Sequence, residues 1–167
     1  MSKILALVQR KSYLLNIFLI SILFFVPALV SEQAIVGPIV NASLILSLIF
    51  LGQGQAFVLA MLPSTVALSS GLLPLAMAPM VPFIILSNVI YLKTFAFIDE
   101  KNSSIIAVLT AALLKSVFLS IVVKTIMLNL LSPVIADNLI NMMTWPQLWT
   151  AAVGGCLAIA IKKHVKI

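Results

Sequence analysis

Long apolar segments, separated by short polar or glycine-rich stretches, dominate the chain. Residues 12–31 carry no charge, and neither do the 60 consecutive residues 33–92. One crossing of a bilayer needs about 20 apolar residues. Helix breakers divide the second run at Gly52-Gln53-Gly54-Gln55 and at Ser69-Ser70-Gly71, with Pro74 following. The pattern predicts helices near 13–31, 34–51, 55–70, 75–98, 103–130 and 147–162.

The positions of the charges favour six spans over the main alternative, in which 33–92 forms two long helices and the total is four. Basic residues gather at both ends of the chain: Lys3, Arg10 and Lys11, then Lys162, Lys163 and Lys166. Basic residues favour the cytoplasmic side, so both ends are expected there and the number of crossings is even. The expected outer segments, near Glu32, at 69–71 and at 132–146, contain no Lys or Arg.

Composition excludes a soluble domain. Apolar residues make up 63% of the chain and charged residues 8%, and the mean hydropathy is +1.26, whereas soluble domains carry about 25% charged residues. The net charge of +6 lies mainly at the ends and is not interleaved with aromatic residues, so nucleic acid is not an expected partner. We expect an all-α polytopic membrane protein: a compact six-helix transmembrane bundle, with residues 1–167 as a single domain, in the lipid bilayer.

The sequence lacks the residue patterns of catalytic and metal sites. No glycine-rich loop ends in Lys-Ser or Lys-Thr, so the chain itself is not expected to bind ATP. The one histidine, His164, stands in the basic tail, and Cys156 is the one cysteine. The four carboxylates are scattered among the expected loops, and no nucleophile stands beside a base. We expect no enzymatic activity, no cofactor and no metal.

Two lysines fall inside the expected fifth span, where ionisable residues are costly and mark functional sites by default. Lys115 lies about 18 Å from a helix start near Ser103, close to the bilayer midplane, and Lys124 lies about 31 Å from it. Asn88 is expected at the depth of Lys115 and within hydrogen-bonding reach. Lys115 is either a packing or partner-contact residue satisfied by Asn88 and backbone carbonyls, or a ligand or coupling residue. Lys124 either snorkels to the outer headgroups, pairs with Glu32 or Asp137, or binds substrate.

Small residues at four-residue spacing predict close helix packing. They are Ala56, Ala60 and Ser64 in the expected third helix, Ala107 and Ala111 in the fifth, and Ala151 with Gly155 and Gly154 with Ala158 in the sixth.

The segment LGQGQAFVLAMLPSTVALSSGLLPLAMAPMVPF, continuing into IILSNVIYLKTF (51–95), resembles the glycine- and proline-punctuated stretch of S-components, the substrate-capture subunits of energy-coupling factor (ECF) transporters. The resemblance implies capture of a vitamin or similar micronutrient at a bacterial or archaeal cytoplasmic membrane, and the two lysines favour an anionic one. A transmembrane T-component and two cytoplasmic ATPases would be the partners. The first helix lacks the family's Ala-x-x-x-Ala docking surface, so the 56–64 face is a candidate replacement. The alternative function is a small stand-alone channel or a ligand-free assembly subunit.

The resemblance also implies a place for the substrate. S-components bind their ligand in the outer half, between the last three helices and under the outer loops. By position, this volume is bordered by Lys124, Glu32 and Asp137, with Trp145 and Trp149 at the start of the last helix. Lys124 would bind an anionic group, and the tryptophans would stack on a ring or anchor the helix at the interface.

Overall fold

The computed structural model describes residues 2–101, 103–127 and 133–165, and every regular element within these ranges is a helix. In chain order the elements are α1 (Ser2–Leu29), α2 (Gln33–Leu51), α3 (Gln53–Leu59), α4 (Leu62–Ser70), the 3₁₀ helix η1 (Leu75–Met80), α5 (Val81–Asp99), α6 (Ser104–Val122), the π-helix η2 (Val123–Met127), α8 (Pro133–Met143) and α9 (Trp145–His164). Residues 128–130 of the expected fifth span, Ser132 and Lys166 lie outside the described residues.

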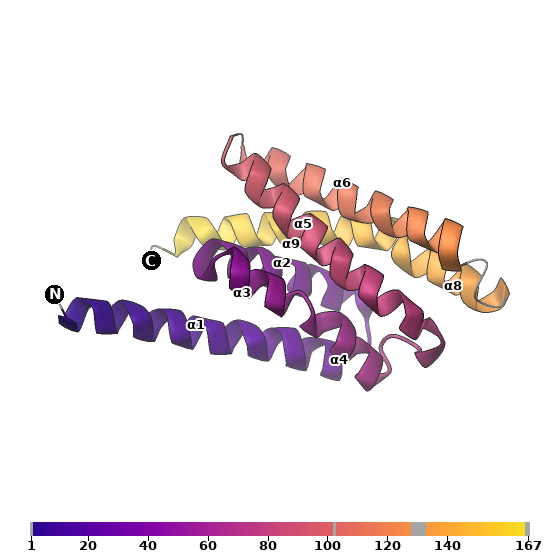
Figure 1. Cartoon of the computed structure of the whole chain (residues 1–167), viewed down its shortest axis with the longest axis horizontal. Helices are drawn as coiled ribbons and strands as arrows, with labels where there is room; N and C mark the ends of the chain where they lie inside the picture. The colour runs from indigo at the N-terminus through magenta and orange to yellow at the C-terminus, as the bar shows by residue number, and fades with distance from the viewer. Residues whose placement is uncertain (1, 102, 128–132, 166–167) are drawn as a thin grey trace.

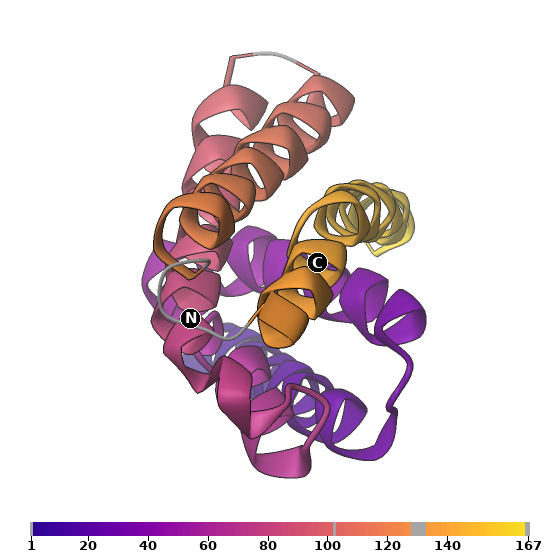
Figure 2. The same ribbon diagram turned by 90° about the vertical axis from the view of Figure 1, so that its right-hand side faces the viewer.

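The helices run back and forth between two ends of an elongated bundle (Figure 1). Both ends of the chain and the turn from α5 to α6 lie at one end, which we call the basic end because it carries Lys93, Lys101, Lys162 and Lys163. The turns from α1 to α2 and from α4 to η1, together with α8, lie at the opposite end, which we call the distal end. Figure 2 looks along the bundle from the distal end and shows α8 close to the start of α9.

Among the described residues, three segments are long and apolar enough to cross a membrane: Gln33–Leu51, Leu75–Asp99 and Ser104–Ile126. Large apolar side chains on the outside of the bundle are exposed, among them Phe18 at 60% and Leu113 at 51%. Such continuous apolar exposure suits contact with lipid and not with water.

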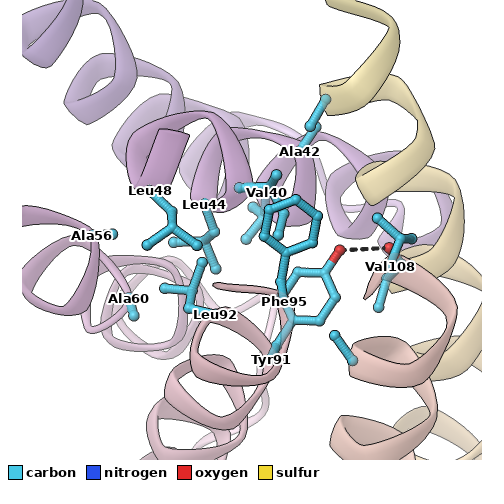
Figure 3. Packing of buried hydrophobic residues seen from close by; sticks show 14 of the residues in the cluster. Val40, Ala42, Leu44, Leu48, Ala56, Ala60, Tyr91, Leu92, Phe95 and Val108 are labelled. Carbon is cyan, nitrogen blue, oxygen red and sulfur yellow. Dashed lines mark hydrogen bonds between the residues drawn. The ribbon is translucent and has the colours of Figure 1, made fainter. Parts of the chain in front are cut away.

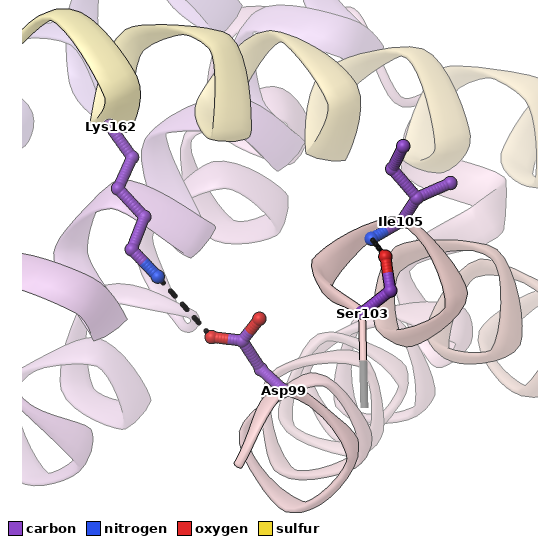
Figure 4. A network of polar contacts seen from close by, with 4 residues as sticks. All are labelled: Asp99, Ser103, Ile105 and Lys162. Carbon is purple, nitrogen blue, oxygen red and sulfur yellow. Dashed lines mark hydrogen bonds and ion pairs between the residues drawn. The ribbon is translucent and has the colours of Figure 1, made fainter. Parts of the chain in front are cut away.

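Local signals in the sequence set several helix boundaries. Glu32 caps α2 by accepting a hydrogen bond from the Ala34 N–H (3.4 Å), and Ser103 caps α6 through the Ile105 N–H (3.4 Å; Figure 4). Pro82 stands in the first turn of α5, where its missing N–H costs nothing. Gly52 separates α2 from α3 with a φ of 87°, a conformation that glycine adopts without strain.

Several expected boundaries are wrong. The first helix begins at Ser2 and not near 13, because polar residues that limit a membrane span still continue a helix. The expected third helix is two short helices with a break at 60–61, since Pro63 cannot donate a backbone hydrogen bond to the preceding turn. The expected fourth helix (75–98) is confirmed as the segment Leu75–Asp99, which begins as the 3₁₀ turn η1, and the expected fifth helix passes into the π-helix η2 at Val123.

The segment 132–146, expected to be an outer loop, contains the helix α8. Its residues Leu139 and Met143 are buried with Met80 and Leu119 in a cluster at the distal end. The four-residue spacing of Leu139 and Met143 places them on one helical face, and this pattern is the sequence signal for α8.

The small residues lie at helix interfaces, as their spacing predicts. A Cβ atom on Gly154 would lie 2.5 Å from the Pro38 carbonyl oxygen of α2, and one on Gly155 would lie 2.5 Å from Val108 Cγ1 of α6. Only a residue without a side chain permits these approaches. Ala56, Ala60 and Ser64 are also buried, at 0%, 0% and 4% exposure. The 56–64 face therefore packs inside the bundle and is not a free docking surface, contrary to the expectation.

A buried apolar cluster packs α2 against α5 (Figure 3). Leu44 and Leu48 of α2 pack with Leu92 and Phe95 of α5 in one buried cluster that also includes Ala107 and Ala111 of α6. Apart from Ser47 of α2, the buried polar residues of the described chain lie in the middle and in the distal half.

Candidate functional site

Three buried polar residues from three helices meet in the middle of the bundle. Lys115 of α6 donates hydrogen bonds from Nζ to Asn41 Oδ1 of α2 (2.7 Å) and to Asn88 Oδ1 of α5 (2.8 Å). Each of the three residues is 2% exposed. We call them the Lys115 cluster.

Both amides are held at their other end as well. Asn41 Nδ2 donates to the Gly37 carbonyl (2.9 Å), one turn earlier in α2. Asn88 Nδ2 donates to the Ala60 carbonyl (3.2 Å), which lies in the break between α3 and α4. Because the nitrogens are committed to carbonyls, the amide oxygens must face Lys115. The break at Ala60 therefore has a structural role: its carbonyl orients Asn88.

Among the described residues, no carboxylate forms a hydrogen bond or an ion pair with Lys115. In the part of the chain that the structure describes, the one ion pair joins Lys162 of α9 to Asp99 of α5 (3.4 Å), at the basic end (Figure 4). The other neighbour of Lys115 is the ring of Tyr91, whose centroid lies 5.4 Å from Nζ. Tyr91 is fixed by donating from its hydroxyl to the Ala151 carbonyl (2.8 Å; Figure 3). The amino group is thus surrounded by neutral acceptors and one aromatic ring.

A cavity of about 100 Å³ extends from the Lys115 cluster toward the distal end. Asn41 and Asn88 are the innermost lining residues on α2 and α5, and Lys115 is the lining residue on α6. Its walls are mainly aliphatic and include Val36, Val40, Pro63, Ala67, Leu72, Leu73 and Ile84. A mostly apolar cavity with a few converging polar groups is the usual form of a small-molecule site.

Side-chain amides connect the elements around the mouth of the cavity. Gln33 Nε2, at the start of α2, donates to the Met142 carbonyl at the end of α8 (3.2 Å), and Gln147 Nε2 of α9 reaches the same carbonyl at 3.5 Å. Gln33, Met142 and Gln147 all line the cavity. The end of α8 is therefore tied to two other helices beside the opening.

The structure brings two of the predicted residues together and separates the others from them. Lys115 and Asn88 are buried and share the expected hydrogen bond. Lys124, Glu32 and Asp137 are exposed at the distal end. Among these described residues, Lys124 makes an ion pair with neither carboxylate.

The two tryptophans also lie away from the cavity. Trp145 is 70% exposed and Trp149 is partly buried, and the cavity wall between them on α9 is Gln147. The substrate-binding roles assigned to the tryptophans, Lys124, Glu32 and Asp137 stay predictions, and none of the five residues lines the cavity that the structure contains.

Asn41 is the member of the Lys115 cluster that the sequence did not single out. It stands in the middle of α2, within the uncharged run 33–92, as Asn88 stands within the fourth expected span. A polar side chain deep in an apolar helix needs a partner, and this was the available signal. Its pairing with Lys115, 74 residues away, depends on how α2 packs against α6.

Comparison with known proteins gives no relative: no family model, no curated protein and no solved structure matches the chain.

Proposed function

We propose that this chain is the substrate-binding membrane subunit of an ECF-type importer, which captures a micronutrient from outside the cell. A T-component and cytoplasmic ATPases would supply the energy for its release inside. The observation that carries the proposal is the cavity that opens at the distal end and extends to the Lys115 cluster. A capture subunit needs such a closed-bottomed site on its outer side.

The distribution of charge supports an orientation with the distal end outside and six crossings. The basic end carries Lys93, Lys101, Lys162 and Lys163 against Asp99 and Glu100, whereas the described residues of the distal end carry Lys124 against Glu32 and Asp137. The end with the excess of lysine is expected in the cytoplasm. The cavity then faces the outside.

The packing disfavours the alternative of a channel. A pore needs a continuous polar path, but below the Lys115 cluster the described core contains tightly packed apolar side chains such as Leu44, Leu92 and Phe95. A path through this region would require the helices to separate. Capture from one side fits the geometry better than continuous conduction.

The proposal predicts uptake that depends on partner subunits. The full chain would be purified in mild detergent, and the small molecules released on denaturation would be identified by mass spectrometry. The compound found would then be supplied, isotopically labelled, to proteoliposomes. We expect binding by the chain alone and accumulation only when the T-component and ATPases are co-reconstituted with ATP. Accumulation by the chain alone on an ion gradient would contradict the proposal, as would the absence of any bound compound.

Cysteine labelling tests the orientation. Two variants would each carry a single cysteine in a Cys156→Ser background. One replaces Ser70 in the distal turn and the other replaces Lys101 in the basic-end turn, and both positions are exposed. We expect a membrane-impermeant maleimide added to intact cells to label the first variant and not the second. Both variants should react after permeabilisation, which controls for reactivity. Labelling of position 101 in intact cells would reverse the orientation.

A further inference from the structure

We infer that the cavity binds a compact aliphatic molecule with one carboxylate, and that Lys115 binds this carboxylate. The inference rests on the proposed function, because it assigns a substrate class to the same cavity. It is carried by the contacts of Lys115 and by the chemistry of the walls.

Lys115 has one donor more than the cluster uses. An ammonium group carries three N–H donors, and two of them are given to Asn41 Oδ1 and Asn88 Oδ1. Lys115 also lines the cavity. An acceptor placed at the inner end of the cavity can therefore take the third N–H without breaking the two existing hydrogen bonds.

The charge of a buried ammonium is uncompensated in the unliganded protein. Its hydrogen-bond acceptors are neutral amides, and among the described residues no Asp or Glu lines the cavity. A buried charge is costly unless it is paired, so a carboxylate gains more at this position than a neutral acceptor does. Lys115 is the one cation among the described lining residues, so it can pair with one negative charge on the ligand.

The walls define the rest of the molecule. They are built largely from valine, leucine, isoleucine, proline and methionine side chains, and none of the lining residues that the structure describes is Phe, Tyr or Trp. A flat aromatic ligand would find no ring to stack on, and a cationic ligand would find no carboxylate. An aliphatic body fits these walls, with the amides of Gln33 and Gln147 near the mouth.

The test uses probes that differ only in charge. Cyclohexanecarboxylate and cyclohexanecarboxamide have nearly the same shape, and cyclohexylmethylamine supplies the opposite charge. Binding of each to the detergent-purified full chain would be measured by thermal shift and by titration. We expect the wild-type protein to bind the carboxylate about tenfold or more tightly than the carboxamide, as a charge-assisted hydrogen bond predicts, and to bind the amine most weakly.

Three variants locate the effect. Lys115→Met should abolish the preference for the carboxylate. Asn41→Asp should abolish the preference as well, because this nearly isosteric change places a carboxylate beside Lys115 that competes with the ligand. This second variant tests the inference even if the Lys115→Met protein fails to fold. Lys163→Met is the matched control, since it removes an exposed lysine at the basic end that does not line the cavity, and it should keep the preference.

Equal wild-type affinity for carboxylate and carboxamide would overturn the inference, and so would a preference that survives in both Lys115→Met and Asn41→Asp. Either result would leave the proposed function intact if the purified chain releases a neutral or cationic compound on denaturation. Proteoliposomes that contain the chain, the T-component and the ATPases would then have to accumulate that compound. A chain that binds neither the probes nor any compound from its own membranes contradicts the proposed function as well.

Discussion

Replacing Asn88 by leucine is expected to lower the free energy of unfolding by about 2–3 kcal/mol. The change removes one of the two amide oxygens that accept from Lys115 Nζ and leaves the Ala60 carbonyl without its side-chain donor. Hydrogen bonds to charged groups contribute about 1.5–3 kcal/mol, and buried groups left unsatisfied add to the cost of losing them. Unfolding in detergent, followed by circular dichroism against denaturant, measures the loss.

The physical cause can be separated from a general loss of packing by a double-mutant cycle with Lys115→Met. Without the amino group, the Asn88 oxygen has less to stabilise, so Asn88→Leu should cost at least about 1 kcal/mol less in the Lys115→Met background. Asn16→Leu is the matched control, because Asn16 donates to Gln55 Oε1 (2.9 Å) at an exposed position with no charge involved, and it should cost about 0.5–1.5 kcal/mol. Additive costs for Asn88→Leu and Lys115→Met would contradict this account of the cluster.

Replacing Gly154 by alanine is expected to destabilise the bundle by about 1–3 kcal/mol, the usual cost of overpacking an interior. The new methyl group would lie 2.5 Å from the Pro38 carbonyl oxygen and 2.9 Å from the Ala42 nitrogen. Both atoms belong to the backbone of α2, so no side-chain rotation relieves the contact and α2 must move away from α9. The melting temperature of the purified protein should fall accordingly.

The displacement should also reach the cavity. The third close contact of the added methyl group is Asn41 Cβ, at 2.7 Å, and Asn41 is one of the two acceptors of Lys115. We therefore expect Gly154→Ala to weaken ligand binding as well as stability. Gly54→Ala in α3 is the control, because nothing lies within 4 Å of its added methyl group, and alanine is favoured over glycine in a helix by about 1 kcal/mol. If the Gly154→Ala and Gly54→Ala proteins had the same melting temperature, α2 and α9 would be packed less closely than the distances above indicate.

Each of the three residues of the Lys115 cluster lies on a different helix, and this arrangement has a mechanical consequence. A ligand that binds Lys115 touches a group hydrogen-bonded to α2 and α5 at once, and through Asn88 the contact extends to Ala60. The cavity end of the bundle is linked by Gln33 and Gln147 to the end of α8. Occupancy of the cavity would therefore stabilise the contacts among several helices together.

The apolar runs and their breakers were sufficient to predict an all-helical chain with long hydrophobic helices. The ends of the helices could be predicted because Gly52, Pro82 and Ser103 act on the backbone of their own turn. Each changes the local backbone conformation or the hydrogen bonding within that turn. The depth of Lys115 and its partner Asn88 also followed from the sequence, because helix rise converts residue number into distance along the axis. Small residues at four-residue spacing correctly predicted close packing.

Only the tertiary structure decided which polar residues form the site. Lys115 and Lys124 stand in the same apolar segment, yet packing buries the first against α2 and α5 and leaves the second exposed. Asn41 entered the cluster, and the 56–64 face turned inward, because of the rotation of α2, α3 and α4 about their axes. That rotation is fixed by contacts between residues far apart in the chain, such as Gly154 against Pro38, and a pattern within one helix does not contain it.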